Sequence, residues 1–297
     1  MRTRTTAATL ILAIATALAG GQEKTEPKAD AAAQKAAVAA NLKKADLGGA
    51  SVVETENFLV ATTLPKERAA ALAAVLEKAA AAARKGAQFE AKEQPWKGKL
   101  AVYYLPSGPE FKSFIRGVVM DQPGGTHFDL RGENPFVVDP AEVGPKATEA
   151  DRFANAAAVV GGAYLKGKAG AAVLPDWLTD GFGRVTAARA EGLNSPRYRA
   201  HRAAASAAAF GARGGKPAAL ADLWAADRPA SAAVLASSFA EYLAYGPGKD
   251  NFAAFIGGFR PNENGDTPGV PQALEAAGWK DVAALEAAWR KWVRTGK

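Results

Sequence analysis

The chain has 297 residues, a formal net charge of +7 and no cysteine. Disulfides therefore cannot stabilise it, and a chain of this length can bury an ordinary core without them. Its basic residues are spread out, with no dense Lys/Arg run interleaved with aromatic residues, which argues against nucleic-acid binding.

The first residues have the features of a secretory signal. Met1-Arg2-Thr3-Arg4 is a basic head, Ala7 to Ala19 is apolar, and Ala17-Leu18-Ala19 matches the A-x-A cleavage pattern. The apolar stretch is much shorter than the ~20 residues that a membrane-spanning helix needs. We therefore expect a signal peptide over residues 1–19 and a secreted or periplasmic protein with no integral membrane segment after cleavage.

Residues 20–49 are rich in alanine and lysine and contain no aromatic residue. Their larger apolar residues are Val38, Leu42 and Leu47. This composition predicts a disordered linker in which residues 31–45 are at most transiently helical.

Residues 50–297 are expected to form one folded domain, strand-rich in its first half. Residues 51–62 are rich in β-branched side chains and indicate a strand or one arm of a hairpin. Pro65 then opens a helix that ends near Gly86. The next expected elements are a strand at 100–105, a helix at 109–117, and two hairpin arms at 126–130 and 135–138.

After Pro145 the pattern is helical almost throughout, with boundaries at Gly, Pro, Asp or Ser. Strands followed by helices predict an α+β fold. The expected helices cover residues 148–166, 175–190, 196–210, 218–225, 230–245, 249–258, 270–277 and 281–294.

One motif carries a resemblance to a known family. Leu174-Pro175-Asp176-Trp177-Leu178-Thr179-Asp180-Gly181 resembles the Leu-Pro-x-Trp-Leu-x-Glu-Gly segment of the peptidase-MA-like gluzincins, which are thermolysin-type zinc peptidases. The order of the other matches, from the strand at Glu56 to the helix at Trp289, is similar to that family as well. The resemblance covers roughly Val52 to Val293 and implies a zincin-like (gluzincin) domain.

The residues that would carry the chemistry are missing. The family has His-Glu-x-x-His on the preceding helix, where two histidines four apart hold Zn²⁺ and the glutamate is the general base. Here Ala158, Val159 and Gly162 match the first histidine, the glutamate and the second histidine. Asp180 stands at the third zinc ligand, one helical turn after Trp177. We therefore expect no catalytic residues, no bound metal and no cofactor.

The remaining candidate metal ligands are few. His127 and Asp129 form His-x-Asp on an expected strand and so share one face, but a third ligand is lacking. A packing role is therefore the simpler interpretation of His127. His201, beside Arg202 in an alanine-rich helix, is expected to be solvated.

These observations predict a catalytically inactive, metallopeptidase-like protein with a binding or scaffolding role at the cell envelope. An extended peptide or an envelope protein would be its partner, because a gluzincin cleft accepts a peptide against a strand edge. One alternative is a hydrolase of another class, for example a glycosidase, that uses acids such as Asp180 in the old cleft. Another is a collapsed cleft without a ligand. For Asp180 itself, the structural alternative to catalysis is a buried acid bonded to backbone.

Overall fold

The computed structural model describes residues 31–141, 144, 146–211, 216–225 and 231–296. The expected signal peptide at 1–19 and the first part of the expected linker lie outside the described residues. Within the described ranges, none of the helices combines the length and the apolar character that a bilayer crossing requires.

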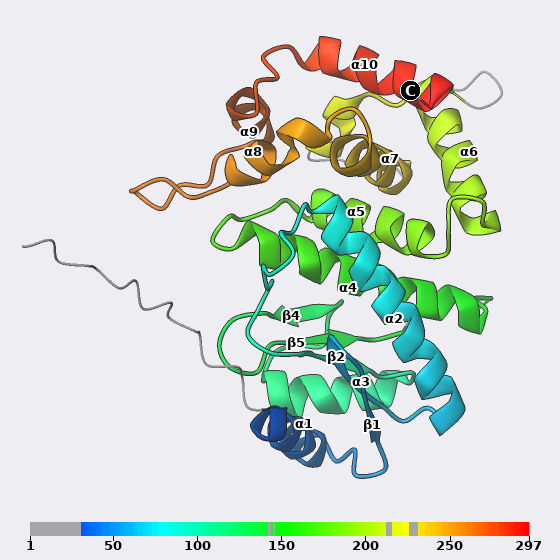
Figure 1. Cartoon of the computed structure of the whole chain (residues 1–297), viewed down its shortest axis with the longest axis vertical. Coiled ribbons are helices and arrows are strands. Elements are labelled where there is room, and N and C mark those ends of the chain that lie inside the picture. Colours follow the sequence, from blue (N-terminus) through cyan, green and yellow to red (C-terminus); the bar gives the residue numbers. More distant parts are fainter. Residues whose placement is uncertain (1–30, 142–143, 145, 212–215, 226–230, 297) are drawn as a thin grey trace, which may run out of the picture.

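A mixed five-stranded sheet forms the centre of the first half (Figure 1). Its spatial order is β1-β2-β3-β5-β4, with parallel pairing among β2, β3 and β5 and antiparallel pairing at both edges. The edge strands are therefore β1 and β4. The strands are β1 (Ser51–Glu54), β2 (Phe58–Thr62), β3 (Leu100–Tyr104), β4 (His127–Asp129) and β5 (Phe136–Asp139).

Every residue of β2 and β3 is buried, because helices cover both faces of the sheet. One face packs on α1 (Ala31–Lys44) and α3 (Gly108–Phe114), which continues as a π-helical turn (Ile115–Val119). The opposite face packs on α2 (Lys66–Gly86) and α4 (Glu149–Ala169). Side chains alternate accordingly, so Tyr103 of β3 faces α3 while Tyr104 faces α4.

Two expectations for this half need correction. Residues 51–62 form two strands, in which Val53 pairs with Val60, and not one. Residues 31–49 differ from the expected disordered linker, because α1 docks on the sheet through one stripe of side chains. Val38 and Leu42 are buried in that stripe, and the Gln34 amide donates to backbone carbonyls, including that of Glu133 at 3.2 Å.

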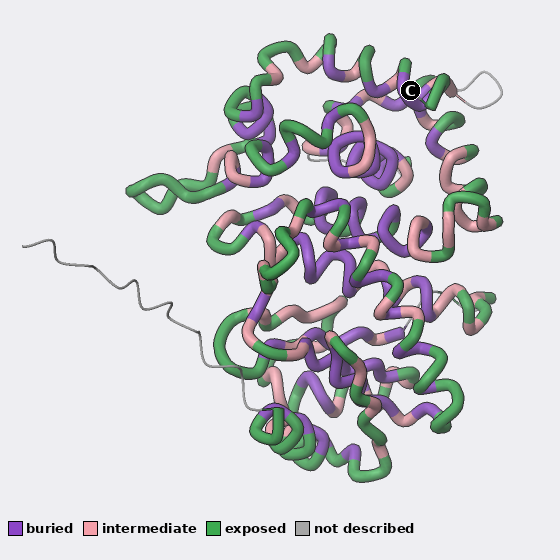
Figure 2. Tube along the Cα trace, in the orientation of Figure 1, coloured by how far each residue is buried: buried purple, intermediate pink, exposed green. Residues whose placement is uncertain are grey.

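The second half is helical, which confirms the α+β class. From the sheet outward come α4, then α5 (Asp176–Ala190), then α7 (Ala232–Tyr245), and α10 (Val282–Thr295) lies at the far end (Figure 1). Buried residues concentrate in the central strands and in α4, α5 and α7 (Figure 2). The remaining helices are α6 (Pro196–Phe210), α8 (Phe252–Gly257) and α9 (Val270–Ala276).

The expected helix at 218–225 is instead a single 3-10 turn, Leu220–Leu223. A second 3-10 turn, Lys249–Asn251, leads into α8.

Candidate functional site: a cleft beside strand β4

Helices α4 and α5 lie side by side. Glycines allow this approach. A Cβ atom on Gly183 would collide with the carbonyl oxygen of Ala158, and one on Gly162 would lie 3.0 Å from the Thr179 methyl carbon. The two helix backbones therefore meet almost directly where they cross.

A small cavity of about 190 Å³, the central pocket, opens where these helices face the β4 edge of the sheet. It contains all three positions matched to the absent His-Glu-x-x-His motif, together with Asp180. Ala158 and Val159 are half-buried and Gly162 is buried, so the floor is made of small apolar groups. The lining residues are Thr126, Phe128, Asn155, Ala158, Val159, Gly162, Thr179, Asp180 and Arg184.

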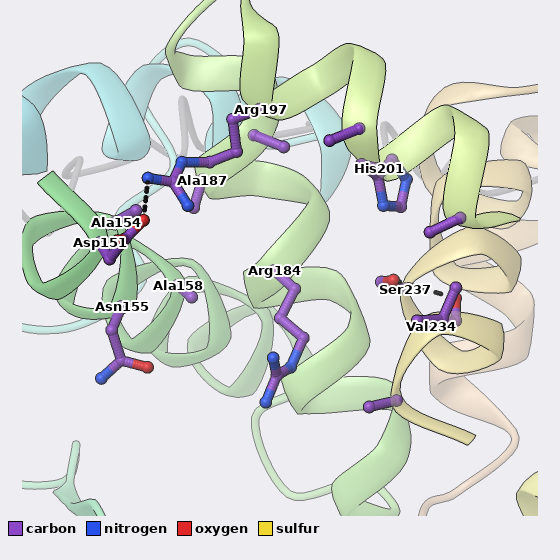
Figure 3. A pocket seen from close by; sticks show the side chains of 14 residues that line it. Asp151, Ala154, Asn155, Ala158, Arg184, Ala187, Arg197, His201, Val234 and Ser237 are labelled. Atoms are coloured by element: carbon purple, nitrogen blue, oxygen red, sulfur yellow. Dashed lines mark hydrogen bonds and ion pairs between the residues drawn. The ribbon is translucent and has the colours of Figure 1, made fainter. Parts of the chain in front are cut away.

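Two larger cavities, each of about 500 Å³, adjoin the central pocket. The helical pocket lies among α4, α5, α6 and α7 and shares Asn155, Ala158 and Arg184 with the central pocket (Figure 3). The strand-end pocket lies beyond the other end of β4 and shares Phe128. The three pockets together are called the cleft below. It follows β4 at one end and reaches α6 and α7 at the other.

Trp177 does not line the central pocket. It is buried on the α7 side of α5, where its ring stacks on Phe239 with the centroids 6.0 Å apart. It borders a separate small pocket that also contains Asp180 and Arg184. Trp177 is therefore a neighbour of the cleft through α5 and not part of its floor.

The charged residues of the cleft differ in how they are neutralised. Arg197 contacts Asp151 at 2.9 Å and Glu191 at 2.6 Å. Hydrogen bonds from Thr148 and from Arg197 lower the pKa of Asp151 to about 2. Arg184 is exposed, and within the part of the chain that the structure describes its side chain makes no hydrogen bond or ion pair.

Buried polar atoms without a protein partner occur in or beside the cleft. Among the described residues they are Thr179 Oγ1, Asp139 Oδ2 and Trp177 Nε1. Thr179 lines the central pocket, and the other carboxylate oxygen of Asp139 accepts a hydrogen bond from Asn155 at 3.3 Å. Burial raises the pKa of Asp139 to about 6 despite this bond.

A second polar feature, which the sequence analysis missed, lies behind the helical pocket. Glu241 on α7 is fully buried, and its Oε1 accepts hydrogen bonds from Arg189 and from Tyr198, both at 2.6 Å. His201 Nε2 lies 3.0 Å from Oε2, and Arg202 Nη1 lies 3.5 Å from the same oxygen. These five residues are called the Glu241 cluster. They join α5, α6 and α7.

Burial opposes the ionisation of Glu241, but hydrogen bonds from His201 and Tyr198 and the positive charge of Arg189 outweigh it. The pKa of the carboxyl is therefore lowered to about 2. The expectation of a solvated His201 is wrong, because its side chain is only 11% exposed and faces this carboxylate.

The other expected positions can now be placed. His127 and Asp129 share a face of β4, and the His127 ring stacks on Phe136 with the centroids 5.9 Å apart, so this histidine packs on the sheet. Asp180 is exposed, so the expectation of a buried acid is wrong. It is the single acid among the described residues that line the central pocket, so this pocket gives no support to a glycosidase-like pair of acids.

The donor set of the central pocket does not fit catalytic zinc, which takes three nitrogen, sulfur or carboxylate ligands from the protein. Ala158, Val159 and Gly162 have no ligating side-chain atom. Across the described ranges, no three His, Cys, Asp or Glu side chains come together in a way that could hold a metal ion.

Comparison of the sequence with protein-family models finds no match, and comparison with curated proteins finds none either.

Proposed function

We propose that this chain is an exported, non-catalytic protein with a gluzincin-like fold that binds an extended peptide in the cleft beside β4. One observation carries the proposal. The positions matched to the zinc-binding motif gather on the apolar floor of a pocket that borders an edge strand. The motif resemblance and the α4–α5 packing support the gluzincin-like fold, and the signal-like N-terminus supports export.

The edge strand supplies the main-chain part of this recognition. β4 pairs with β5 on one side, and no described strand pairs with its other side. An extended peptide can add to such an edge through backbone hydrogen bonds while alternate side chains enter pockets. Phe128 of β4 lines both the central pocket and the strand-end pocket. Side chains of a peptide paired with β4 could therefore enter these two pockets.

The test uses a mixture of random synthetic peptides of about eight residues, captured on immobilised protein. Val159→Trp fills the central pocket from a half-buried position. Gly162→Trp is less suitable because its first side-chain atom would already press on Thr179. Val52→Trp, on the opposite edge strand, is the matched control, because Val52 is 40% exposed.

We expect the native protein and the Val52→Trp variant to retain the same peptides, and the Val159→Trp variant to bind them at least about tenfold more weakly. Peptides methylated at backbone nitrogens should also lose binding, because β-strand addition uses those donors. Equal retention by Val159→Trp and the native protein would exclude the cleft as the binding site.

The proposed lack of catalysis has a separate test. Elemental analysis of the purified protein should find no stoichiometric zinc, and peptides incubated with it should remain intact. Stoichiometric zinc together with cleavage that a chelator abolishes would contradict the proposal.

A further inference from the structure

We propose that Arg184 recognises a carboxylate of the bound peptide, placed in the helical pocket at the α6–α7 end of the cleft. This inference rests on the proposed function and adds the chemistry of the ligand. The carboxylate would belong to the C-terminus of the peptide or to an Asp or Glu side chain.

The position of Arg184 is the first argument. It lies on α5 and borders the central pocket, the helical pocket and the small pocket beside Trp177. Figure 3 shows its side chain extending from α5 into the space between Asn155 on α4 and Val234 on α7. A peptide that runs from β4 past Ala158 would meet this guanidinium on entering the helical pocket.

The charge balance is the second argument. The formal charges that line the helical pocket, with histidine neutral, are those of Asp151, Arg184 and Arg197, which leave one net positive charge. Arg197 is already held by Asp151 and Glu191. His201 is directed to Glu241, which is itself surrounded by cations. Among the described residues, Arg184 is therefore the cation of this pocket that forms no ion pair; Asp180, one helical turn earlier on α5, borders the central pocket and not the helical one.

The chemistry of the walls is the third argument. Short apolar side chains form most of the lining of the helical pocket: Ala154, Ala158, Ala187, Ala188, Ala200, Ala204, Ala233 and Val234. A carboxylate bound there would have mostly apolar neighbours, and its charge-assisted hydrogen bond to the solvent-exposed Arg184 would be the polar contact that orients it. A guanidinium also presents two parallel N–H donors that match a carboxylate.

One unpaired positive charge suits a monoanion, which favours a carboxylate over a doubly charged phosphate.

The test compares two random peptide mixtures of about eight residues, one with free C-termini and one with amidated C-termini. The protein variants are Arg184→Gln, Arg184→Lys and, as the matched control, Arg199→Gln. Arg199 is exposed on α6 and lines none of the three pockets, so this change removes the same charge outside the cleft. The best peptides are resynthesised with each carboxylate converted to an amide, and affinities are measured by fluorescence polarisation.

We expect one carboxylate to matter in the native protein, so that converting it to an amide weakens binding by about tenfold. Selection from the free-terminus mixture alone identifies a C-terminal carboxylate. Enrichment of Asp or Glu at one position of the amidated peptides identifies a side chain. In Arg184→Gln the same conversion should have no effect, Arg184→Lys should retain part of the preference, and Arg199→Gln should behave like the native protein.

Two results would overturn the inference. If peptides bind but the acid and amide forms bind equally, or Arg184→Gln keeps the preference, Arg184 is not the recognition residue while peptide binding stands. If the native protein captures no peptide from either mixture, the proposed function fails and this inference fails with it.

Discussion

Glu241 is a buried acid whose carboxylate has four side-chain partners from two other helices. Its carboxylate lies among two arginines, a histidine and a tyrosine, with no exposure to solvent. Removing one member of a buried charge network leaves the others uncompensated, which costs more than the intact network contributes. The fold of α5, α6 and α7 should therefore depend on this one negative charge.

Replacing Glu241 with Gln should lower the free energy of unfolding at pH 7 by on the order of 3 kcal/mol, because Arg189 and Arg202 lose their counter-charge. The lowered pKa of Glu241 also makes stability depend on pH. The contribution of the ionised Glu241 carboxylate to stability is complete above the ordinary glutamate pKa of 4.5 and is lost as the pH falls toward about 2.

Urea unfolding from pH 7 down to pH 2 checks both effects. The native protein should lose stability over that window, and Glu241→Gln should show a flatter dependence. Glu263→Gln is the control, because Glu263 is exposed. Parallel pH curves for Glu241→Gln and the native protein would contradict the assignment.

One feature of the sequence does point to this cluster. Glu241 is the single charged residue of α7, whose other residues are mostly apolar. A lone acid in such a helix is expected to be buried and paired. Its partners could not be named in advance, because Arg189, Tyr198 and His201 come from other helices whose crossing depends on the whole fold.

The pairing of α4 with α5 is the element-scale feature on which the candidate site depends. Replacing Gly183 with Ala places a methyl group against the Ala158 carbonyl, so the helices must separate. We expect a loss of about 2 kcal/mol or more in the free energy of unfolding, larger than the gain in helix propensity.

Gly257→Ala is the matched control, because a Cβ atom at the end of α8 meets nothing within 4 Å. It should leave stability unchanged or raise it by up to about 1 kcal/mol. Chemical unfolding of both variants measures the difference. A Gly183→Ala protein as stable as Gly257→Ala would show that the close approach of α4 and α5 is not required.

At this scale the sequence was a good guide to the helices and a weaker one to the cleft. Helices α5 and α6 begin directly after Pro175 and Ser195, as these residue types predict. Ala158, Val159, Gly162 and Asp180, which the resemblance groups in one site, line one pocket. The participation of Phe128 could not be predicted, since it depends on how β4 is placed against these helices. Arg184 could have been found, because it follows Asp180 by four residues and therefore shares its face of α5.

The described part of the molecule is layered: α1 and α3 cover one face of the sheet, α2 and α4 cover the other, and α5 and α7 follow beyond α4. The sheet has a large core on its α2 and α4 face and a smaller core on its α1 and α3 face. Composition suggested that the chain before residue 50 would not pack, because alanine and lysine dominate it. The spacing of Gln34, Val38 and Leu42 at intervals of four is nevertheless a helical stripe. The stripe alone does not show that α1 packs on the protein, because the surface it contacts is formed by the sheet and α3.

The buried side chains of α1 belong to the smaller core, so a charge placed among them should detach α1 from the sheet. Leu42→Asp places a carboxylate in the apolar cluster that contains Tyr103 and Phe114, where burying a charge is unfavourable. Ala39→Asp adds the same charge on the exposed side of α1 and serves as the control.

Hydrogen exchange followed by mass spectrometry should find residues 31–45 protected in the native protein and in Ala39→Asp, and rapidly exchanging in Leu42→Asp. Thermal unfolding of Leu42→Asp should shift downward by several degrees, because the second face of the sheet loses its cover. The larger core on the other face should keep its protection, since α1 does not contribute to it. If residues 31–45 exchange rapidly in the native protein as well, α1 is not a stable layer of the fold, and the expectation of a linker there would be restored.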